Sequence, residues 1–230
     1  MAEHMSSHRM SYADAKDFVD RARARSSAAA GARVISLDEV RAAGASSPRW
    51  QLDDLTGRLT ELSGLGAVAS FTAATALVLE AQCRGEPIAW IMLPGRSFFP
   101  PDLADSGIDL HALVVVRVRD PIAMARAADT LLRSGSFGLV LLDLGATAEL
   151  AMATQGRLVG LAQRHDAALV AITDKPRDAA SLGSIVSLRA EAVRERTRTG
   201  FTVTLRALKD KRRGPGWSEC TDVIPPAGMK

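Results

Sequence analysis

The stretch that decides the fold is residues 57–93, GRLTELSGLGAVASFTAATALVLEAQCRGEPIAWIML. It contains a short strand pattern at 58–62, a glycine turn, a long apolar helix at 69–84 and an uninterrupted apolar strand at 88–93. A strand that is buried on both faces has a continuous apolar run, and strands that alternate with helices form parallel sheets. The stretch therefore predicts the first strand–helix–strand unit of an α/β fold.

The same alternation continues further along the chain. Strands are predicted at 112–118, 138–143 and 168–173, and helices at 121–134 and 149–165. This order predicts a mostly parallel sheet with helices on both faces. Two final strands, joined by an Arg/Glu/Thr-rich turn at 194–200, predict an antiparallel β-hairpin appended to that sheet.

The chain divides into three parts. Residues 1–47 hold MAEHM, which resembles a vector-encoded remnant, then an amphipathic helix over 11–25 and a flexible SSAAAGA joint. Ser11 is the expected N-cap of that helix, and Tyr12, Phe18 and Val19 lie on its apolar face. Residues 48–217 form the predicted core, and residues 218–230 a polar tail. We therefore expect an N-terminal helical arm hinged to one globular domain.

Composition excludes several classes of protein. Of the 230 residues, 47% are hydrophobic and 24% charged, which are ordinary globular values. No apolar run approaches about 18 residues and the N-terminus has no signal sequence, so we expect a cytoplasmic protein without a membrane span. Cys83 and Cys220 lie far apart and predict reduced thiols. The four histidines are not spaced as metal ligands, so we expect no metal site.

The glycine turn lacks the chemistry of a phosphate-binding loop. In the motif G-x-x-x-x-G-K-[ST], backbone N–H groups hold phosphates, the lysine reaches the terminal phosphates and the hydroxyl binds Mg²⁺. Counted from Gly64, the second glycine is Ala69, the lysine is Ser70 and the hydroxyl residue is Phe71. No other catalytic constellation is visible. The sequence therefore predicts a nucleotide-hydrolase core that has lost hydrolysis, with no nucleotide cofactor, no catalytic residues and a binding role.

Charge is concentrated near the C-terminus. The chain carries a net charge of +3, whereas residues 189–213 contain nine basic and three acidic side chains, a balance of +6. Such asymmetry favours an anionic partner, either nucleic acid or an acidic protein surface, and the alternative is a solvated basic edge. The candidate partner-binding residues are Arg194, Arg196, Arg198, Lys209, Lys211, Arg212 and Arg213.

Over residues 50–217, the order of these motifs resembles the ATPase core of RecA. The matching pieces are GRLTELSG, SGSFGLVLLDLGA, LVGLAQRHDAALVAITD and FTVTLRALKDKRRGPGW. The resemblance identifies Asp143 with the Walker B carboxylate and places the catalytic glutamate near Pro94, which cannot accept a proton. The segments that match the two DNA-binding loops of RecA, near 144–155 and 174–184, are shortened.

A lysine pair survives in this resemblance. In RecA a similar pair reaches across a subunit interface toward the neighbour's ATP, and the N-terminal helix packs on a neighbouring core. Lys209 and Lys211 match that pair. The resemblance therefore implies a cap, which docks against a RecA protomer and offers no ATP to the next one. A solvated strand end is the alternative interpretation of Lys209, Lys211, Arg212 and Arg213.

RecA-like chains with a degenerate Walker A loop are typical of the ImuA family, and this chain resembles that family in length, N-terminal arm, degenerate loop and basic C-terminal hairpin. The resemblance implies an accessory protein of SOS mutagenesis and translesion DNA synthesis that contacts RecA and ImuB with its error-prone polymerase. Two alternatives remain open: a SulA-like inhibitor of cell division, and a weak, sequence-independent DNA-binding module. The sequence leaves open which partner is primary, which face docks and whether RecA is activated or inhibited.

Overall fold

The computed structural model describes residues 50–65, 69–96, 98–146, 149–198 and 200–223. Their centre is an eight-stranded sheet of order β3-β2-β4-β5-β1-β6-β7-β8. The strands are β1 (Leu59–Ser63), β2 (Ile88–Met92), β3 (Leu113–Arg117), β4 (Leu139–Gly145), β5 (Ala168–Thr173), β6 (Leu188–Arg196), β7 (Phe201–Asp210) and β8 (Ser218–Val223). The pairings from β3 to β6 are all parallel, and β7 and β8 continue the sheet in antiparallel fashion.

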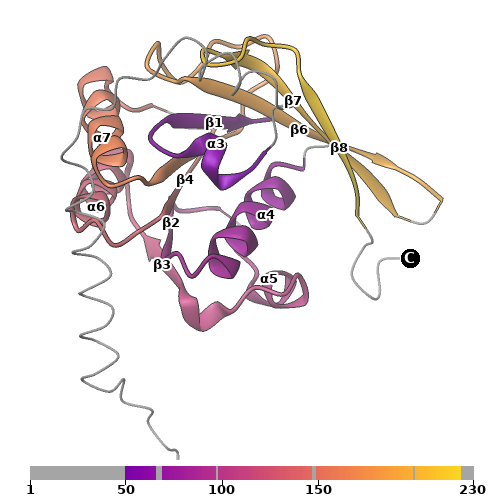
Figure 1. Cartoon of the computed structure of the whole chain (residues 1–230), viewed down its shortest axis with the longest axis horizontal. Coiled ribbons are helices and arrows are strands. Elements are labelled where there is room, and N and C mark those ends of the chain that lie inside the picture. The colour runs from indigo at the N-terminus through magenta and orange to yellow at the C-terminus, as the bar shows by residue number, and fades with distance from the viewer. Residues whose placement is uncertain (1–49, 66–68, 97, 147–148, 199, 224–230) are drawn as a thin grey trace, which may run out of the picture.

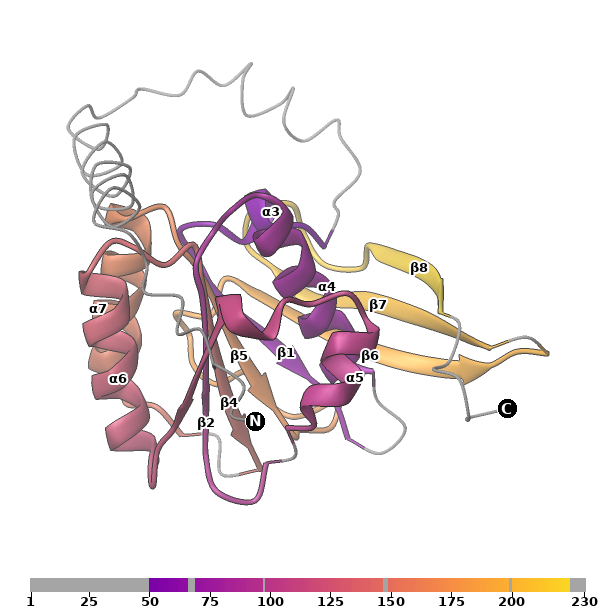
Figure 2. The same cartoon turned by 90° about the horizontal axis from the view of Figure 1, so that it is seen from below.

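Helices cover both faces of the parallel strands (Figures 1 and 2). The helices are α3 (Leu52–Leu55), α4 (Ser70–Cys83), α5 (Pro100–Asp105), α6 (Pro121–Arg133) and α7 (Met152–Arg164), and a 3₁₀ turn spans Leu110–Ala112. Side chains of α3, α4 and α5 belong to one buried cluster, and side chains of α6 and α7 to the other. Every residue of β1, β2, β4 and β5 is buried, as expected for strands between two helical layers.

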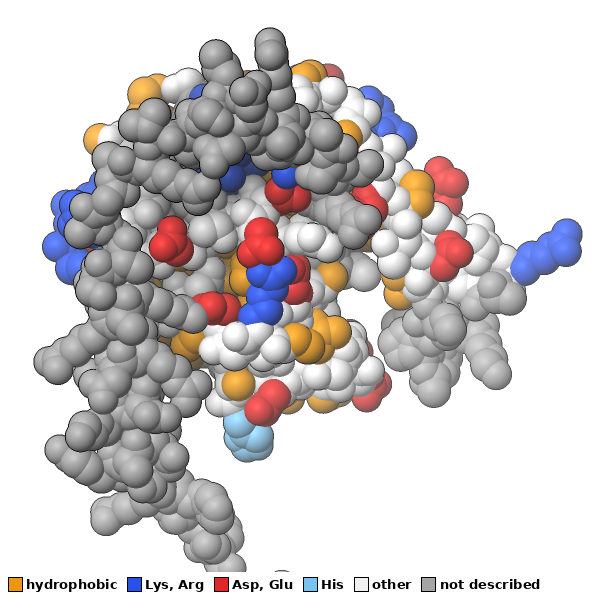
Figure 3. All heavy atoms as spheres, viewed as in Figure 1, with side chains coloured by type: hydrophobic (Ala, Val, Ile, Leu, Met, Phe, Trp, Pro, Cys, Tyr) orange, Lys and Arg blue, Asp and Glu red, His pale blue; other side chains and the backbone are white. Residues whose placement is uncertain are grey.

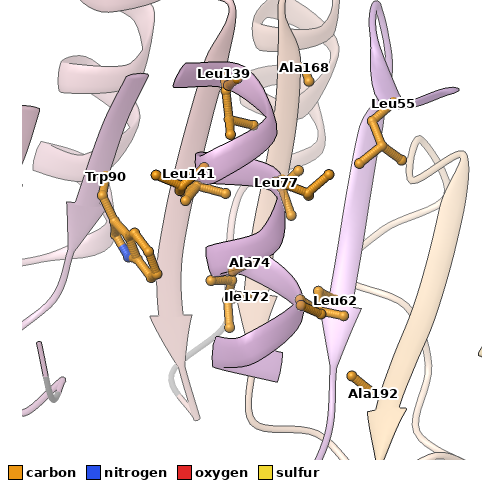
Figure 4. Close-up of a cluster of buried hydrophobic side chains, with 14 of the residues drawn as sticks. Leu55, Leu62, Ala74, Leu77, Trp90, Leu139, Leu141, Ala168, Ile172 and Ala192 are labelled. Carbon is orange, nitrogen blue, oxygen red and sulfur yellow. The ribbon is translucent and has the colours of Figure 1, made fainter. Parts of the chain in front are cut away.

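Helix α4 packs on one face of the sheet and runs roughly along its central strands (Figure 4). Its Ala74 and Leu77 are fully buried against Leu62 of β1 and Leu141 of β4. The small residues on α4 allow the close approach that such packing requires. The helix ends at Cys83, where Gly85 takes a φ of +70° that favours glycine.

The start of α6 is set by two local signals. The Asp120 side chain accepts a hydrogen bond from the Ala123 N–H at 2.7 Å, and Pro121 occupies the first turn. An aspartate N-cap followed by proline is a strong helix start, because the carboxylate accepts from an otherwise unpaired N–H and proline has no N–H to leave unpaired. By contrast, the N-cap residue of α4, Ala69, provides no side-chain cap.

The predicted α/β architecture and its C-terminal hairpin are confirmed, and the three long predicted helices and the core strands lie within three residues of their expected bounds. One boundary is wrong. Residues 218–230 were expected to be a tail, but Ser218–Val223 form β8 and pair with β7 along its whole length. The Glu219 carboxylate also accepts a hydrogen bond from the Trp50 N–H at 3.0 Å. The predicted arm, with its helix at 11–25, lies outside the described residues.

A buried ion pair joins a residue near the start of the described chain to one near its end. The Arg58 guanidinium, just before β1, bonds the Asp210 carboxylate at the end of β7 at 2.8 Å, and both side chains are nearly inaccessible. Burial alone would raise the pKa of Asp210, but hydrogen bonds from the Arg212 N–H, Arg58 and the Trp217 indole hold it below its usual value. A buried carboxylate with three donors is a stabilising contact only while it is charged.

Replacement of this carboxylate tests its contribution. We expect Asp210→Asn to lower the free energy of unfolding by about 3 kcal/mol at neutral pH, because Arg58 would be left buried without a countercharge. The depressed pKa means that the carboxylate stabilises the fold above the ordinary carboxyl pKa and that this contribution is lost as pH falls through the folded-state value. In urea unfolding followed by circular dichroism, the two proteins should therefore converge in acid. A gap that stays constant with pH would contradict this assignment.

Candidate functional site

The degenerate phosphate loop is already occupied by the protein's own groups. The Gly64 N–H donates to the Thr173 carbonyl at 3.2 Å, and the Ala69 N–H donates to the Ala192 carbonyl at 2.8 Å. In a working loop such N–H groups would point at phosphate. Here two of them complete the packing of β1 and α4 against neighbouring strands.

The two side chains that replace lysine and the Mg²⁺ ligand are also unsuited to phosphate. Ser70 is the first residue of α4 and is buried, and its hydroxyl has no hydrogen-bond partner among the described residues. Phe71 packs on Trp90 of β2 with 5.0 Å between ring centroids. Trp90 in turn meets Phe98, which follows β2. An aromatic side chain, packed on Trp90, therefore stands in the first turn of α4 where the phosphate-loop motif would require a hydroxyl.

An arginine joins the ends of the two central strands. The Arg96 Nε donates to Asp143 of β4 at 2.7 Å, and its Nη1 donates to Asp174, directly after β5, at 2.5 Å. A second bond links Nη2 to the other Asp174 oxygen at 3.2 Å. Arg96 follows β2, so three neighbouring strands meet in this ion-pair cluster. In a parallel sheet of this kind, the carboxyl edge is where ligands normally bind.

Burial and the neighbouring Arg96 act on the pKa of Asp143 in opposite directions. Its side chain is only 3% exposed. Burial raises the pKa of Asp143, and the Arg96 guanidinium acts in the opposite direction. The guanidinium therefore supplies, from within the chain, the positive charge that a metal ion or lysine would supply in a nucleotide site. The arrangement can hold the loop after β2 against the sheet, and it leaves Asp143, which the resemblance matched to the Walker B carboxylate, paired with Arg96.

A second set of buried charges holds the segment 174–187. Glu61 of β1 is fully buried; its carboxylate bonds the Lys175 ammonium at 3.0 Å, the Leu182 N–H at 2.7 Å and the Thr173 hydroxyl at 2.9 Å. Arg189 of β6, also buried, donates to the carbonyl oxygens of Pro176 and Ala179. This segment contains the one that was matched to the second DNA-binding loop of RecA. Both of its halves are tied to the sheet.

The lysine pair contacts the same segment. The Lys209 ammonium lies 3.4 Å from the Ser181 hydroxyl, and Lys211 donates to the Ser184 carbonyl at 2.5 Å. Lys209 is half-buried, and burial together with Lys211 and Arg189 lowers its pKa. One of the two interpretations of the sequence placed both lysines at a solvated strand end, whereas only Lys211 is exposed. The two lysines therefore contact the second half of segment 174–187.

The two neighbouring arginines contact the start of the core. The Arg213 guanidinium bonds the Asp54 carboxylate at 2.6 Å. Arg212 donates to the Thr56 carbonyl at 3.1 Å and to the Asp54 carbonyl at 3.4 Å. Both arginines therefore help to join β7 to α3. Neither is free to act as a mobile partner-binding group without loss of these contacts.

Arg194, Arg196 and Arg198 lie elsewhere, near the tip of the β6–β7 hairpin, and all three are exposed. Arg194 stacks over the Phe201 ring at 5.5 Å. Because Arg194 pairs with Val203, six residues before Lys209, the two basic groups are about 20 Å apart along the sheet. The predicted basic region is thus two separate surfaces. Tyr12, Phe18 and Val19, the other predicted contact residues, lie outside the described residues.

Sequence reasoning missed Arg96, Asp174 and Glu61. A signal for Asp174 existed, since Asp174, like Asp143, follows an apolar strand run and such strands were predicted to be parallel. Arg96 had no comparable signal, because its partners depend on β2 lying beside β4. Glu61 looked like an ordinary polar residue in a half-buried strand.

Other kinds of site are not found in this part of the chain. Among the described residues, no cluster of three or more His, Cys, Asp or Glu side chains could hold a metal ion. None of the helices in the described ranges combines the length and apolar character that a membrane span requires. An open groove between α6 and α7 is lined by Ile122, Ala125 and Leu150 with Asp129 and Arg157 at its rim, and it contains none of the predicted site residues.

No protein-family model matches the chain, and a search of curated proteins finds no match.

The Arg96 cluster can be tested through stability. We expect Arg96→Ala to lower the free energy of unfolding by at least about 2 kcal/mol at neutral pH, because Asp143 would stay buried without a countercharge. Without Arg96 the pKa of Asp143 should rise further, so the deficit should shrink as pH falls. Thermal unfolding over a pH series measures both effects. The double variant Arg96→Ala/Asp143→Asn should recover part of the loss, and exposed Arg164→Ala should change little. Equal stability of wild type and Arg96→Ala would remove the cluster as a structural element.

The occupied loop gives a second expectation. Addition of millimolar Mg-ATP should leave the melting temperature unchanged, since a ligand that binds the folded state even weakly would raise it by mass action. Differential scanning fluorimetry with Mg-ATP, Mg-ADP and Mg²⁺ alone is sufficient. A rise that depends on nucleotide concentration would show a binding mode independent of Ser70 and Phe71.

Proposed function

We propose that this protein is a non-catalytic, RecA-like accessory protein of SOS mutagenesis and translesion DNA synthesis, which binds RecA, ImuB or both and modulates RecA activity. The observation that carries the proposal is the Arg96 bridge between Asp143 and Asp174. It occupies the edge of the sheet where a nucleotide hydrolase would need a free carboxylate and a metal ion. A chain with this internal arrangement is suited to binding rather than to hydrolysis.

The architecture supports the same proposal. A parallel body followed by antiparallel strands agrees with what the resemblance to RecA implies. The Ala69 N–H, bonded to Ala192, and the aromatic contact of Phe71 lie where the resemblance places the groups of the phosphate loop. Loss of nucleotide chemistry within an intact scaffold is expected of an adaptor.

The surface that we assign to RecA is the lysine pair with the segment it holds, residues 181–184, Lys209 and Lys211. Lys211 is exposed, and neither ammonium forms an ion pair with a described carboxylate. Contacts between these lysines and serine groups of the same segment give them fixed positions, which lowers the entropic cost of binding an anionic group on a partner. Docked through this surface, the chain would act as a cap, because it offers no nucleotide to a following protomer.

The two alternative functions, a SulA-like inhibitor and a DNA-binding module, predict different partners or a different surface. A SulA-like inhibitor would bind FtsZ and leave RecA unaffected. A DNA-binding module would track phosphates along a continuous basic surface. Here Arg194 and Lys209 are about 20 Å apart along the sheet, and segment 174–187 is tied to the sheet by Glu61 and Arg189. The RecA-directed proposal has the better physical support.

The decisive measurement is the single-stranded-DNA-dependent ATPase rate of RecA as this chain is titrated in at low salt. We expect the rate to change at well below one chain per RecA, because a cap acts on filament ends. Lys209→Ala/Lys211→Ala should weaken the effect by about tenfold, as expected for the loss of two interfacial charges.

Two controls separate binding from folding. The exposed Arg164→Ala removes a positive charge at the far end of α7 and should leave the effect unchanged. The double lysine variant must keep its far-ultraviolet circular dichroism, since Lys209 is half-buried. A flat ATPase response up to an equimolar ratio would exclude the cap. Binding to ImuB, and then to FtsZ, would be the next interactions to measure.

A further inference from the structure

Strand β6 extends well beyond its inner neighbour. β1 pairs with β6 only from Thr60–Ser63 to Leu188–Glu191, whereas β6 continues to Arg196. The outer part of β6 with β7 and β8 forms a three-stranded ribbon that projects from the body (Figures 1 and 2). On the side that β1 would cover, residues 193–196 therefore form a strand edge with no partner strand among the described residues.

The backbone direction along this edge follows from two hydrogen bonds. The carbonyl of Ala190 accepts from the Ser63 hydroxyl, and the carbonyl of Ala192 accepts from the Ala69 N–H, so both carbonyls point toward the β1 side. Backbone groups of alternate residues in a strand point to the same side. The N–H and C=O groups of Arg194 and Arg196 therefore point to the open edge, with no hydrogen-bond partner within the described ranges.

The side chains of these two residues also share one face. Arg194 pairs with Val203 and Arg196 with Phe201 across the hairpin. Arg194 lies over the Phe201 ring at 5.5 Å, which fixes the guanidinium and leaves its N–H groups toward solvent. Figure 3 shows basic side chains at the free end of the ribbon. Two guanidinium groups, about 7 Å apart along the strand, thus flank the open backbone groups.

Arginines elsewhere in the described chain are mostly neutralised. Those in ion pairs with carboxylates are Arg58, Arg84, Arg96, Arg119, Arg133, Arg157, Arg177, Arg206 and Arg213. By contrast, Arg194, Arg196 and Arg198 have no ion pair with a described carboxylate. Glu195 lies between them in sequence but on the opposite face, where Thr202 bonds Asp222. The positive face is therefore left without a countercharge in the described chain.

We propose that the outer edge of β6, at Arg194 and Arg196, binds an extended acidic segment of a partner protein by strand addition. The partner's main chain pairs with the open N–H and C=O groups of Arg194 and Arg196. Its acidic side chains, at alternate positions, meet the two guanidinium groups as cross-strand ion pairs. The site lies on a different element from the lysine pair and does not depend on RecA.

The chemistry of the edge favours peptide over nucleic acid. Donors and acceptors alternate along an open strand, and a polypeptide in the extended state presents the complementary alternation, whereas a phosphate backbone has acceptors only. The carboxylates of Glu195 and Asp222 on the other face of the ribbon would repel a polyanion that wrapped around it.

The experiment uses the full chain and two fluorescein-labelled heptapeptides with the same composition, TETETET and TTEEETT, in fluorescence anisotropy at low salt. Only the first places glutamates at alternate positions, so we expect it to bind several-fold more tightly. Arg194→Glu/Arg196→Glu should weaken its binding by about tenfold or more, since each attraction becomes a repulsion. Arg126→Glu/Arg164→Glu, an equal charge change on the exposed surfaces of α6 and α7, should have little effect.

A pair of variants isolates the backbone contribution. Arg194→Ala and Arg194→Pro both remove the guanidinium, but only proline also removes the outward N–H; because that N–H does not bond β7, the hairpin should be kept. We expect Arg194→Pro to bind TETETET more weakly than Arg194→Ala, with unchanged circular dichroism. Equal binding of the two peptides, or of the two variants, would overturn strand addition. Arginine-dependent binding of an oligothymidylate, with neither peptide bound, would instead assign this face to nucleic acid and overturn the proposal.

Discussion

The arrangement of the candidate site depends on the contact between Arg96 and the two strand-end carboxylates, Asp143 and Asp174. A parallel sheet brings the carboxyl ends of its strands to one edge, and acidic residues there repel one another unless a cation lies between them. Nucleotide hydrolases use a metal ion and a lysine for this purpose. In this chain the cation is the Arg96 guanidinium, which bridges the two carboxylates from within the protein.

An internal cation has consequences for neighbouring segments. The loop after β2 is held against β4 and β5. Next to this loop, Phe71 in the first turn of α4 packs on Trp90 of β2. Beside it, Glu61 and Arg189 satisfy their buried charges with groups from the segment 174–187. Removal of one partner from such a buried cluster leaves an uncompensated charge, so each charge helps to keep its partners in place. The segment 174–187 is thereby tied to the sheet.

The sequence was sufficient for the elements that have strong periodic patterns. The apolar strands β2, β4 and β5 and the helices α4 and α6 are close to their predicted positions because local patterning and tertiary burial agree there. Strand β8 was missed because SECTDV has no apolar run; its place is decided by hydrogen bonds to β7 and by Glu219 with Trp50. Arg96 was missed for a related reason: an ion pair between residues 47 positions apart depends on strand order, which a linear pattern does not contain.

The basic C-terminal region shows why a charge count alone misleads. Residues 189–213 carry a balance of +6, yet Arg189 is buried, Arg213 pairs with Asp54, and Lys209 and Lys211 contact serine groups of one segment. At the hairpin tip, by contrast, the guanidinium groups of Arg194, Arg196 and Arg198 form neither ion pairs nor hydrogen bonds with described residues. Two surfaces with different geometry result: a fixed lysine pair beside a tied segment, and an open strand edge on a projecting ribbon. The adaptor proposal rests on these two separate surfaces together with the Arg96-bridged sheet edge, because a protein that joins partners needs more than one binding surface and no catalytic site.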